Sequence, residues 1–366
     1  MTAPRVSIVM SVFNGERFLA EAVDSILNQS FRDFEFIIIE DGSTDGSSQI
    51  LDSYQNNDAR VAVYRQKNRG LIASLNRGCA LARGKYIARM DADDIAVRDR
   101  LQGQVDFMED HPEVGVLGGA TEWIDITGKS LLRCRFPITD REIKSALRRG
   151  DCPLAHPTVI MQKEVFASVA GYRTAMLHAE DYDLWLRIAD RFQLANLDAV
   201  VLKYRVHPDQ VSIRRCRQQA LSNLAARIAA SSRRNGNPEP FDSVEEITPK
   251  MLAGLGVTEA KQQTTVVRGC LSCMSSMCEA GEYSIALDEL SKLLRCSDLK
   301  LVESPEMADL RLLAARLYWH QSRVARSILS AGHAVIARPI ILGRPLKPLM
   351  RWLGLADAPG EKISRC

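Results

Sequence analysis

Short apolar runs alternate with amphipathic segments through the first half of the chain. The apolar runs are continuous rather than alternating, as expected of strands that are covered on both faces. They predict strands at Val6–Val12, Phe34–Ile39, Val61–Tyr64, Tyr86–Met90 and Val114–Leu117. The segments between them predict helices near Arg17–Gln29, Ser47–Gln55, Leu71–Ala82 and Asp99–Glu109. This alternation indicates an α/β fold with a mostly parallel sheet and helices on both faces.

The pattern changes twice along the rest of the chain. After about Gly119 we expect a hairpin around Thr127-Gly128, then helices at Asp140–Arg149, Lys163–Ala170 and Asp181–Arg191, and a last strand at Val200–Tyr204. From Arg214 onward helices are expected near Gln218–Arg233, Val266–Ala280, Ile285–Leu294 and Asp309–Ser330. Asn235–Pro240 is typical of a linker or long turn. We therefore expect a first domain at residues 1–215 and an α-helical C-terminal region at 216–366.

Composition narrows the class of protein. The 366 residues are 46% hydrophobic and 25% charged, which is ordinary for a soluble globular protein. The net charge of +3 is too small to predict nucleic-acid binding. No signal peptide is visible, and no apolar stretch reaches the roughly 18 residues that a membrane span needs. Nine cysteines in such a chain favour reduced thiols. These features predict a cytoplasmic protein.

Three carboxylates directly follow the strand predicted at Tyr86–Met90. Asp91 and Asp93 share one face of an extended segment, and Asp94 adds a third acid. Like charges this close repel one another unless a cation lies between them, and a divalent metal prefers such oxygen ligands. The carboxyl end of a strand is also where open α/β sheets bind ligands. The cluster therefore predicts a metal-dependent ligand site.

Three further motifs accompany this cluster, and the order of all four along the chain matters as much as their residues. They are the strand and polar turn Val6–Asn14, the acidic turn Ile39–Gly46, and the acids before an apolar helix at Glu180–Arg187. The phrases Asn68–Leu71, His156–Val159 and Tyr204–His207 lie between or after them. Together these motifs resemble the family 2 glycosyltransferases, which have the GT-A fold. The resemblance runs from about Val6 to Val211.

The resemblance implies a nucleotide site. Phe13 would lie against the base, and Asp41 would accept a hydrogen bond from a ring N–H of a pyrimidine, as in a UDP- or dTDP-sugar. Asp91 would bind the ribose. Asp93 would ligate Mn²⁺ or Mg²⁺ on the diphosphate, and His207 would approach the same metal. The same side chains also admit structural roles, namely acids that cap a helix, an Asx-turn residue at Asp41 and a loop histidine.

The resemblance also implies the catalytic base. Asp181 would take the proton of the attacking hydroxyl group, and Glu180 is its alternative. Asp183 ranks below both because it should face another way on a helix. One-step attack would invert the anomeric centre. The structural alternative for Asp181 is a charge that complements the helix dipole.

The C-terminal region is basic and apolar. Between Leu310 and Ala356 there is no acidic residue, and there are eight Lys or Arg residues. Trp352 and several leucines and isoleucines lie among them. Such a segment suits an anionic membrane surface, which would fit a lipid-linked acceptor. The alternative is a helical cap that packs on the catalytic domain.

These expectations describe an inverting, metal-dependent glycosyltransferase. It would transfer a sugar from a nucleoside-diphosphate donor to a hydroxyl of a glycan or lipid-linked acceptor in bacterial surface polysaccharide biosynthesis. It would act in the cytoplasm or at the inner face of the cell membrane. One rival is a sugar-nucleotide nucleotidyltransferase, which would have a Gly-rich basic loop where Phe13–Glu16 stands. The other rival is a catalytically silent glycan-binding scaffold, which would lack Asp93 or Asp181.

Overall fold

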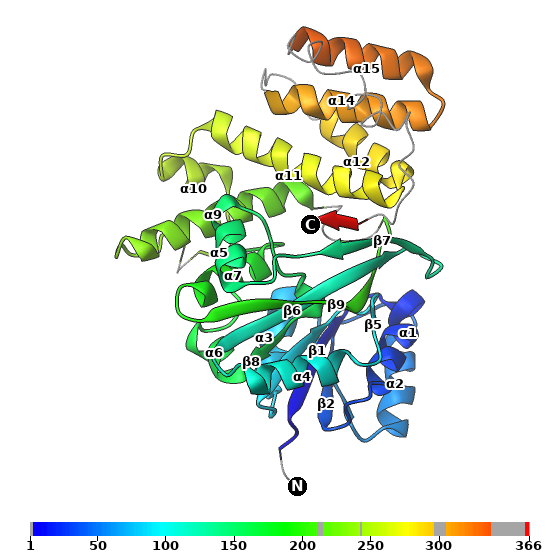
Figure 1. Cartoon of the computed structure of the whole chain (residues 1–366), viewed down its shortest axis with the longest axis vertical. Helices are drawn as coiled ribbons and strands as arrows, with labels where there is room; N and C mark the ends of the chain where they lie inside the picture. The colour runs from blue at the N-terminus through cyan, green and yellow to red at the C-terminus, as the bar shows by residue number, and fades with distance from the viewer. Residues whose placement is uncertain are drawn as a thin grey trace. The chain divides into compact units, whose positions relative to one another are not determined.

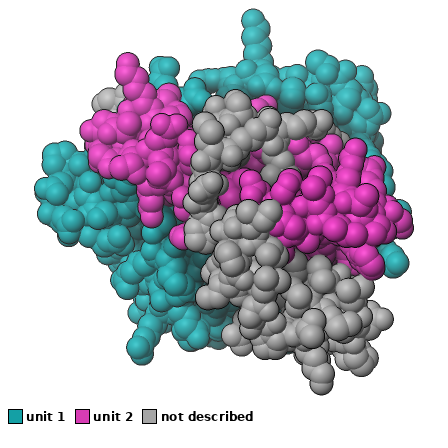
Figure 2. All heavy atoms as spheres, turned by 90° about the horizontal axis from the view of Figure 1, so that it is seen from above, with its two compact units in different colours: residues 1–206, 226–246, 363–366 teal, residues 207–225, 247–362 magenta. Residues whose placement is uncertain are grey.

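The computed structural model describes residues 3–208, 210, 215–241, 244–295, 305–337 and 363–365. The chain forms two compact units, coloured in Figure 2. The first comprises Met1–Val206, Ala226–Glu246 and Ile363–Cys366, and the second comprises His207–Ala225 and Ile247–Lys362. Residues 226–246 thus group with the N-terminal part, although the predicted C-terminal region includes them. A domain boundary at residue 215 stays a prediction.

One mixed sheet organises the first unit (Figure 1). Its main path runs in the order β10-β7-β6-β8-β4-β1-β2-β3, and β9 pairs with β5 and β6. The strands are β1 (Val6–Val12), β2 (Phe34–Glu40), β3 (Val61–Arg65), β4 (Tyr86–Met90), β5 (Ile95–Ala96), β6 (Val114–Ile124), β7 (Ser130–Arg135), β8 (Ile160–Gln162), β9 (Gln193–Arg205) and β10 (Ile363–Arg365). Because β3, β2, β1 and β4 are parallel, their carboxyl ends lie along the same edge.

Helices cover both faces of this sheet, as the sequence predicts. The helices are α1 (Glu16–Leu27), α2 (Ser47–Asn57), α3 (Leu71–Leu81), α4 (Arg100–Asp110), α5 (Asp140–Arg149), α6 (Lys163–Ser168) and α7 (Glu180–Ala189), with a short 3-10 turn η1 (His156–Thr158). Apolar residues of α1 and α4 pack with Ile8 and Met10 in one core cluster. On the other face α3 lies so close that a Cβ on Gly78 would be 2.5 Å from Val9. The strands are therefore buried on both sides.

The sequence prediction is least complete beyond β6. The predicted hairpin is confirmed by antiparallel β6 and β7. The strand predicted at Val200–Tyr204 is the end of β9, which has 13 residues and runs parallel to β6. β8 was not predicted, because three residues carry too little pattern. Cys134 on β7 is disulfide-bonded, so the expectation of reduced thiols is wrong at this residue.

The second unit is helical. Helix α9 (Cys216–Arg234) begins in it, and α10 (Pro249–Gly254), α11 (Glu259–Ala280), α12 (Tyr283–Arg295), α14 (Pro305–His320) and α15 (Val324–Ala337) follow. The single helix predicted at Asp309–Ser330 is wrong, because the chain turns between α14 and α15. Ser322 has a φ of 57°, and the N–H of Arg323 donates to the carbonyl of Tyr318 at 2.8 Å. Within the described residues, none of the helices is both long and apolar enough to span a bilayer.

Candidate active site

The predicted carboxylate cluster lies at the carboxyl end of β4. Single side-chain oxygens of Asp91, Asp93 and Asp94 all lie within 4.8 Å of one another. Asp91 and Asp93 are half-buried, whereas Asp94 is 1% exposed. Burial, and then the charges of Asp93 and Asp91, raise the pKa of Asp94 well above its usual range. Three acids are thus held together at a cost that a cation would relieve.

Two buried arginines hold this cluster in place. Arg89 is 2% exposed, and its Nη2 donates to Asp91 Oδ1 at 2.5 Å. Arg205, at the end of β9, donates its backbone N–H to Asp94 Oδ1 at 2.8 Å and its Nε to the carbonyl of Asp93 at 2.8 Å. The turn after β4 therefore has a fixed backbone, with its carboxylates grouped.

The cluster fits a divalent cation. Asp94 Oδ2 is buried and has no hydrogen-bond partner in the part of the chain that the structure describes. A buried, unpaired carboxylate oxygen is costly, and carboxylates are the ligands that Mn²⁺ and Mg²⁺ favour. His207 lies in the second unit, with its backbone N–H 3.4 Å from Gln210 Oε1. Its role as a metal ligand stays a prediction.

The residues predicted for the nucleotide base follow β1 and β2. The ring of Phe13 is 51% exposed directly after β1, which suits stacking against a base. Asp41 follows β2 and is 1% exposed. Its carboxylate accepts hydrogen bonds from the Gln66 side chain at 2.7 Å and from the backbone N–H groups of Arg69 and Gly70 at 2.9 Å. Asp41 therefore anchors a loop, and a carboxylate has room for about one further donor.

A second acidic pair, Glu180 and Asp181, lies at the start of helix α7. Glu180 is 6% exposed, and burial followed by the charge of Asp181 raises its pKa to about 8. Asp181 is half-buried, and burial raises its pKa to about 6. The Cys152 thiol lies 3.8 Å from Asp181 Oδ2. Asp183 is 0% exposed and is paired with Arg173 and Arg187, which leaves it less suited to proton transfer than Asp181.

Arg89 connects the two acidic groups electrostatically. Its positive charge opposes the rise in pKa that burial causes at Asp91, Glu180 and Asp181. These carboxylates are separated by about 90 positions in the sequence, yet they act on the same guanidinium. The fold thus places the predicted ribose-binding and base residues within electrostatic range of one buried arginine.

A neutral polar pair lies beside them. His156 Nε2 and the Tyr172 hydroxyl are 2.8 Å apart, and burial lowers the pKa of His156 well below its usual range. Neither Arg89 nor Arg205 was predicted as a site residue from the sequence. The available signal for Arg89 was its charge, since it lies inside an apolar strand and two positions before Asp91. The contacts of Arg205 with residues more than 100 positions away left no local signal.

Comparisons with known proteins agree with this fold. A mannosyltransferase from Pyrobaculum calidifontis, solved in complex with GDP-Man and Mn²⁺, has a TM-score of 0.51 and is 19% identical. The match covers 88% of this chain and 89% of that one. This likeness confirms the GT-A fold.

Sequence comparison gives the family. The model of Glycosyl transferase family 2 matches residues 7–168. AmsE, an amylovoran biosynthesis glycosyltransferase of Erwinia amylovora, is 33% identical over 213 residues, covering 57% of this chain and 79% of AmsE. WbnJ, an O-antigen biosynthesis glycosyltransferase of Escherichia coli, is 32% identical over 206 residues, covering 55% and 80%. EpsE of Bacillus subtilis is 35% identical over 213 residues, covering 57% and 75%. The chain belongs to the family 2 glycosyltransferases.

Proposed function

We propose that this glycosyltransferase transfers a sugar from a nucleoside-diphosphate donor to a hydroxyl of a glycan or lipid-linked acceptor, in the biosynthesis of a bacterial surface polysaccharide. The observation that carries the proposal is the group of three carboxylates at the carboxyl end of β4, whose Asp91 is hydrogen-bonded to the buried Arg89. The names of AmsE and WbnJ support a role in polysaccharide assembly. The GDP-Man and Mn²⁺ of the Pyrobaculum calidifontis enzyme support a metal-assisted nucleotide-sugar site.

On the donor side, the enzyme must bind the nucleotide and compensate the negative charge of the leaving diphosphate. Phe13 stacks on the base, Asp41 accepts a hydrogen bond from it, and Asp91 binds the ribose. Asp93 and Asp94 would hold a divalent cation, Mn²⁺ or Mg²⁺. When bound, this cation supplies Lewis-acid stabilisation of the negative charge that develops on the leaving diphosphate.

The acceptor side needs a base that is ionised near neutral pH. Asp181, whose pKa is raised to about 6, is mostly a carboxylate at pH 7, whereas Glu180, whose pKa is raised to about 8, is mostly protonated. Asp181 Oδ2 therefore takes the proton of the attacking hydroxyl as its oxygen bonds to the anomeric carbon. The nucleoside diphosphate leaves from the opposite face in the same step, so the anomeric centre is inverted.

A donor panel tests the proposal. The protein is melted with UDP-, dTDP- and GDP-sugars, each with and without Mn²⁺, because a ligand that binds only the folded state raises Tm. We expect one nucleotide class to raise Tm in a metal-dependent way, and the same sugar nucleotide to yield nucleoside diphosphate and glycoside. If the whole panel leaves Tm unchanged with both Mn²⁺ and Mg²⁺, the proposal fails.

The pH dependence of transfer follows from the pKa of Asp181. Only the carboxylate form is a base, and this form is populated above the raised pKa of about 6. We expect kcat/KM to fall about tenfold for each pH unit below that value. Steady-state rates between pH 4.5 and 8 measure this acidic limb of the pH profile, in which kcat/KM falls as the pH is lowered. The residual activity of Asp181→Asn should lack it, and a limb that persists in this variant would assign the titration to another group.

We also propose that residues 310–356 contact the inner face of the cell membrane. Residues 338–356 lie outside the described structure, but α15 is described. Val324, Ile328 and Leu329 on α15 are 47%, 67% and 61% exposed, and Arg323 and Arg326 beside them are exposed cations. Ser327, directly before Ile328, is buried and donates to the carbonyl of Ala315 on α14. An outward apolar face flanked by arginines fits an anionic lipid surface.

Replacing Ile328 and Leu329 together by glutamate should weaken binding of the full chain to phosphatidylglycerol vesicles by at least about tenfold, since two apolar anchors are lost. Cosedimentation measures this binding, and vesicles of phosphatidylcholine alone should bind weakly. Ile138→Glu, at a residue that is 46% exposed in the first unit, is the matched control. Unchanged binding of the double variant, or a change only in oligomeric state, would exclude this face of α15 as the lipid contact.

A further inference from the structure

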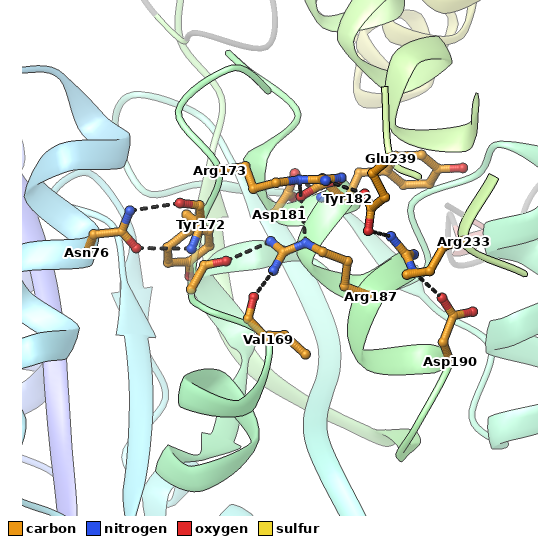
Figure 3. Close-up of polar contacts among 12 residues, drawn as sticks. Asn76, Val169, Tyr172, Arg173, Asp181, Tyr182, Arg187, Asp190, Arg233 and Glu239 are labelled. Carbon is orange, nitrogen blue, oxygen red and sulfur yellow. Dashed lines mark hydrogen bonds and ion pairs between the residues drawn. The ribbon is translucent and has the colours of Figure 1, made fainter. Parts of the chain in front are cut away.

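The segment expected to be a linker, Asn235–Pro240, is bound to the catalytic unit by ion pairs. Glu239 Oε1 accepts from Arg233 Nη1 at 2.8 Å, and Oε2 accepts from Arg173 Nη1. Its side chain is 16% exposed. Arg233 and Arg173 lower the pKa of Glu239 against the effect of its burial. Figure 3 shows Glu239 between these two arginines. The segment lies beyond residues 7–168, which the family model matches.

Both arginines connect Glu239 to the surroundings of helix α7. Arg233 Nε donates to Asp190 Oδ2 at 2.7 Å, just after the end of α7. Arg173 lies in the loop before α7, and its Nε donates to the buried Asp183 at 3.0 Å in the first turn of that helix. Glu239 therefore joins contacts at both ends of α7.

The loop at residues 169–179 is held in a conformation that its local sequence does not favour. Ala170 and His178 have φ values of 59° and 64°, which are uncommon for residues other than glycine. Such a backbone persists only where surrounding contacts determine it. The contacts of this loop therefore matter for its geometry.

Two further side chains bind the backbone of this loop (Figure 3). The Asn76 amide donates to the carbonyl of Tyr172 at 2.8 Å and accepts from its N–H at 3.0 Å. Arg187, on α7, donates to the carbonyl of Gly171 at 2.7 Å and also to that of Val169. Because the loop leads directly into Glu180 and Asp181, these contacts set where the acidic pair of α7 lies.

We propose that Glu239 is a positioning residue for the catalytic base, a role that rests on the function proposed above. With Arg173, it ties the loop at 169–179 to the chain that follows α9, and so holds the first turn of α7 and Asp181 against the acceptor hydroxyl. Without the Glu239 carboxylate, Arg173 and Arg233 lose their shared counter-ion. The loop then keeps its attachments to Asn76 and Arg187 and the ion pair of Arg173 with Asp183, but it loses its attachment to the chain that follows α9.

Glu239→Gln in the full chain tests this role by two measurements. Hydrogen exchange read by mass spectrometry should show faster exchange of amides 169–182, and little change in β1 to β4. With the best donor of the panel, transfer kcat should fall about tenfold, because a misplaced base loses part of the orientation effect. The Tm shift with nucleotide and Mn²⁺ should be unchanged, since Phe13, Asp91 and Asp93 are untouched. Glu245→Gln, at an exposed carboxylate six positions beyond Glu239, should match the native protein in every measurement.

The outcomes separate this inference from the proposed function. If native protein transfers no sugar from any donor, the proposed function fails, and the exchange data still report on the loop. If native protein is active and Glu239→Gln exchanges or turns over like it, the positioning role is wrong. A uniform rise in exchange with a lowered Tm would mean that Glu239 only stabilises the fold, which also overturns the inference.

Discussion

Replacing Asp93 by alanine is expected to abolish both the metal-dependent Tm shift and sugar transfer. Asp93 lies in one group with Asp91 and Asp94, and Asp94 Oδ2 is buried and lacks a hydrogen-bond partner in the described structure. Removing one hard oxygen ligand weakens cation binding and leaves the charge of the leaving diphosphate uncompensated. We expect kcat to fall by at least about a thousandfold, or about 4 kcal/mol of transition-state stabilisation.

The measurement needs a control for the loss of negative charge. Asp99→Ala removes an exposed carboxylate six positions along, whose side chain makes no capping hydrogen bond, and it should keep the full Tm shift. Calorimetry with Mn²⁺ and the donor then compares the two variants directly. Native-like Mn²⁺ binding by Asp93→Ala would remove Asp93 from the metal site and leave Asp91 and Asp94 as the ligands to test.

Asp181→Asn is expected to separate binding from chemistry. The amide is close in shape to the carboxylate but does not accept a proton, so transfer should fall about 10²–10⁴-fold. The metal-dependent Tm shift should remain, because the variant leaves Phe13, Asp91 and Asp93 unchanged. Rates with saturating donor and acceptor, together with the melting curve, measure both properties on one sample.

Comparing Glu180→Gln with Asp181→Asn identifies which of the two acids is the base. If Asp181 is the base, Glu180→Gln keeps more activity than Asp181→Asn, because Glu180 is already mostly protonated at pH 7. The reverse order would assign the base to Glu180. Full transfer by Asp181→Asn would remove Asp181 from the catalytic role altogether.

Local sequence patterns were sufficient to predict the parallel strands and several helices. The strand predicted at Tyr86–Met90 has the same bounds in the structure, and the helix at Asp140–Arg149 begins with a capping box formed by Thr139 and Glu142. Such elements are defined by side chains that lie within a few residues of one another. The clustering of Asp91 and Asp93 was predictable for the same reason, since both project from one face of one extended segment.

Elements that depend on distant partners were predicted poorly. Most of β9 was missed, because its pairing with β6 compensates for a weak strand pattern around Asp198. The turn at Ser322 was read as helix, because a single serine in the left-handed region has no strong sequence signal. Glu239 was assigned to a linker, since its neighbouring prolines and asparagines indicate a turn whatever the side chain contacts.

The sequence by itself determined the class of enzyme, the acids at the end of β4 and the acids at the start of α7, because each depends on residue type and short spacing. Only the tertiary structure decided that Arg89 is shared between those acids, that Asp41 is engaged by its own loop, and that Glu239 is tied to Arg173. The physical reason is that burial and ion pairing depend on chain segments far apart in sequence. Those segments meet only once the sheet has assembled.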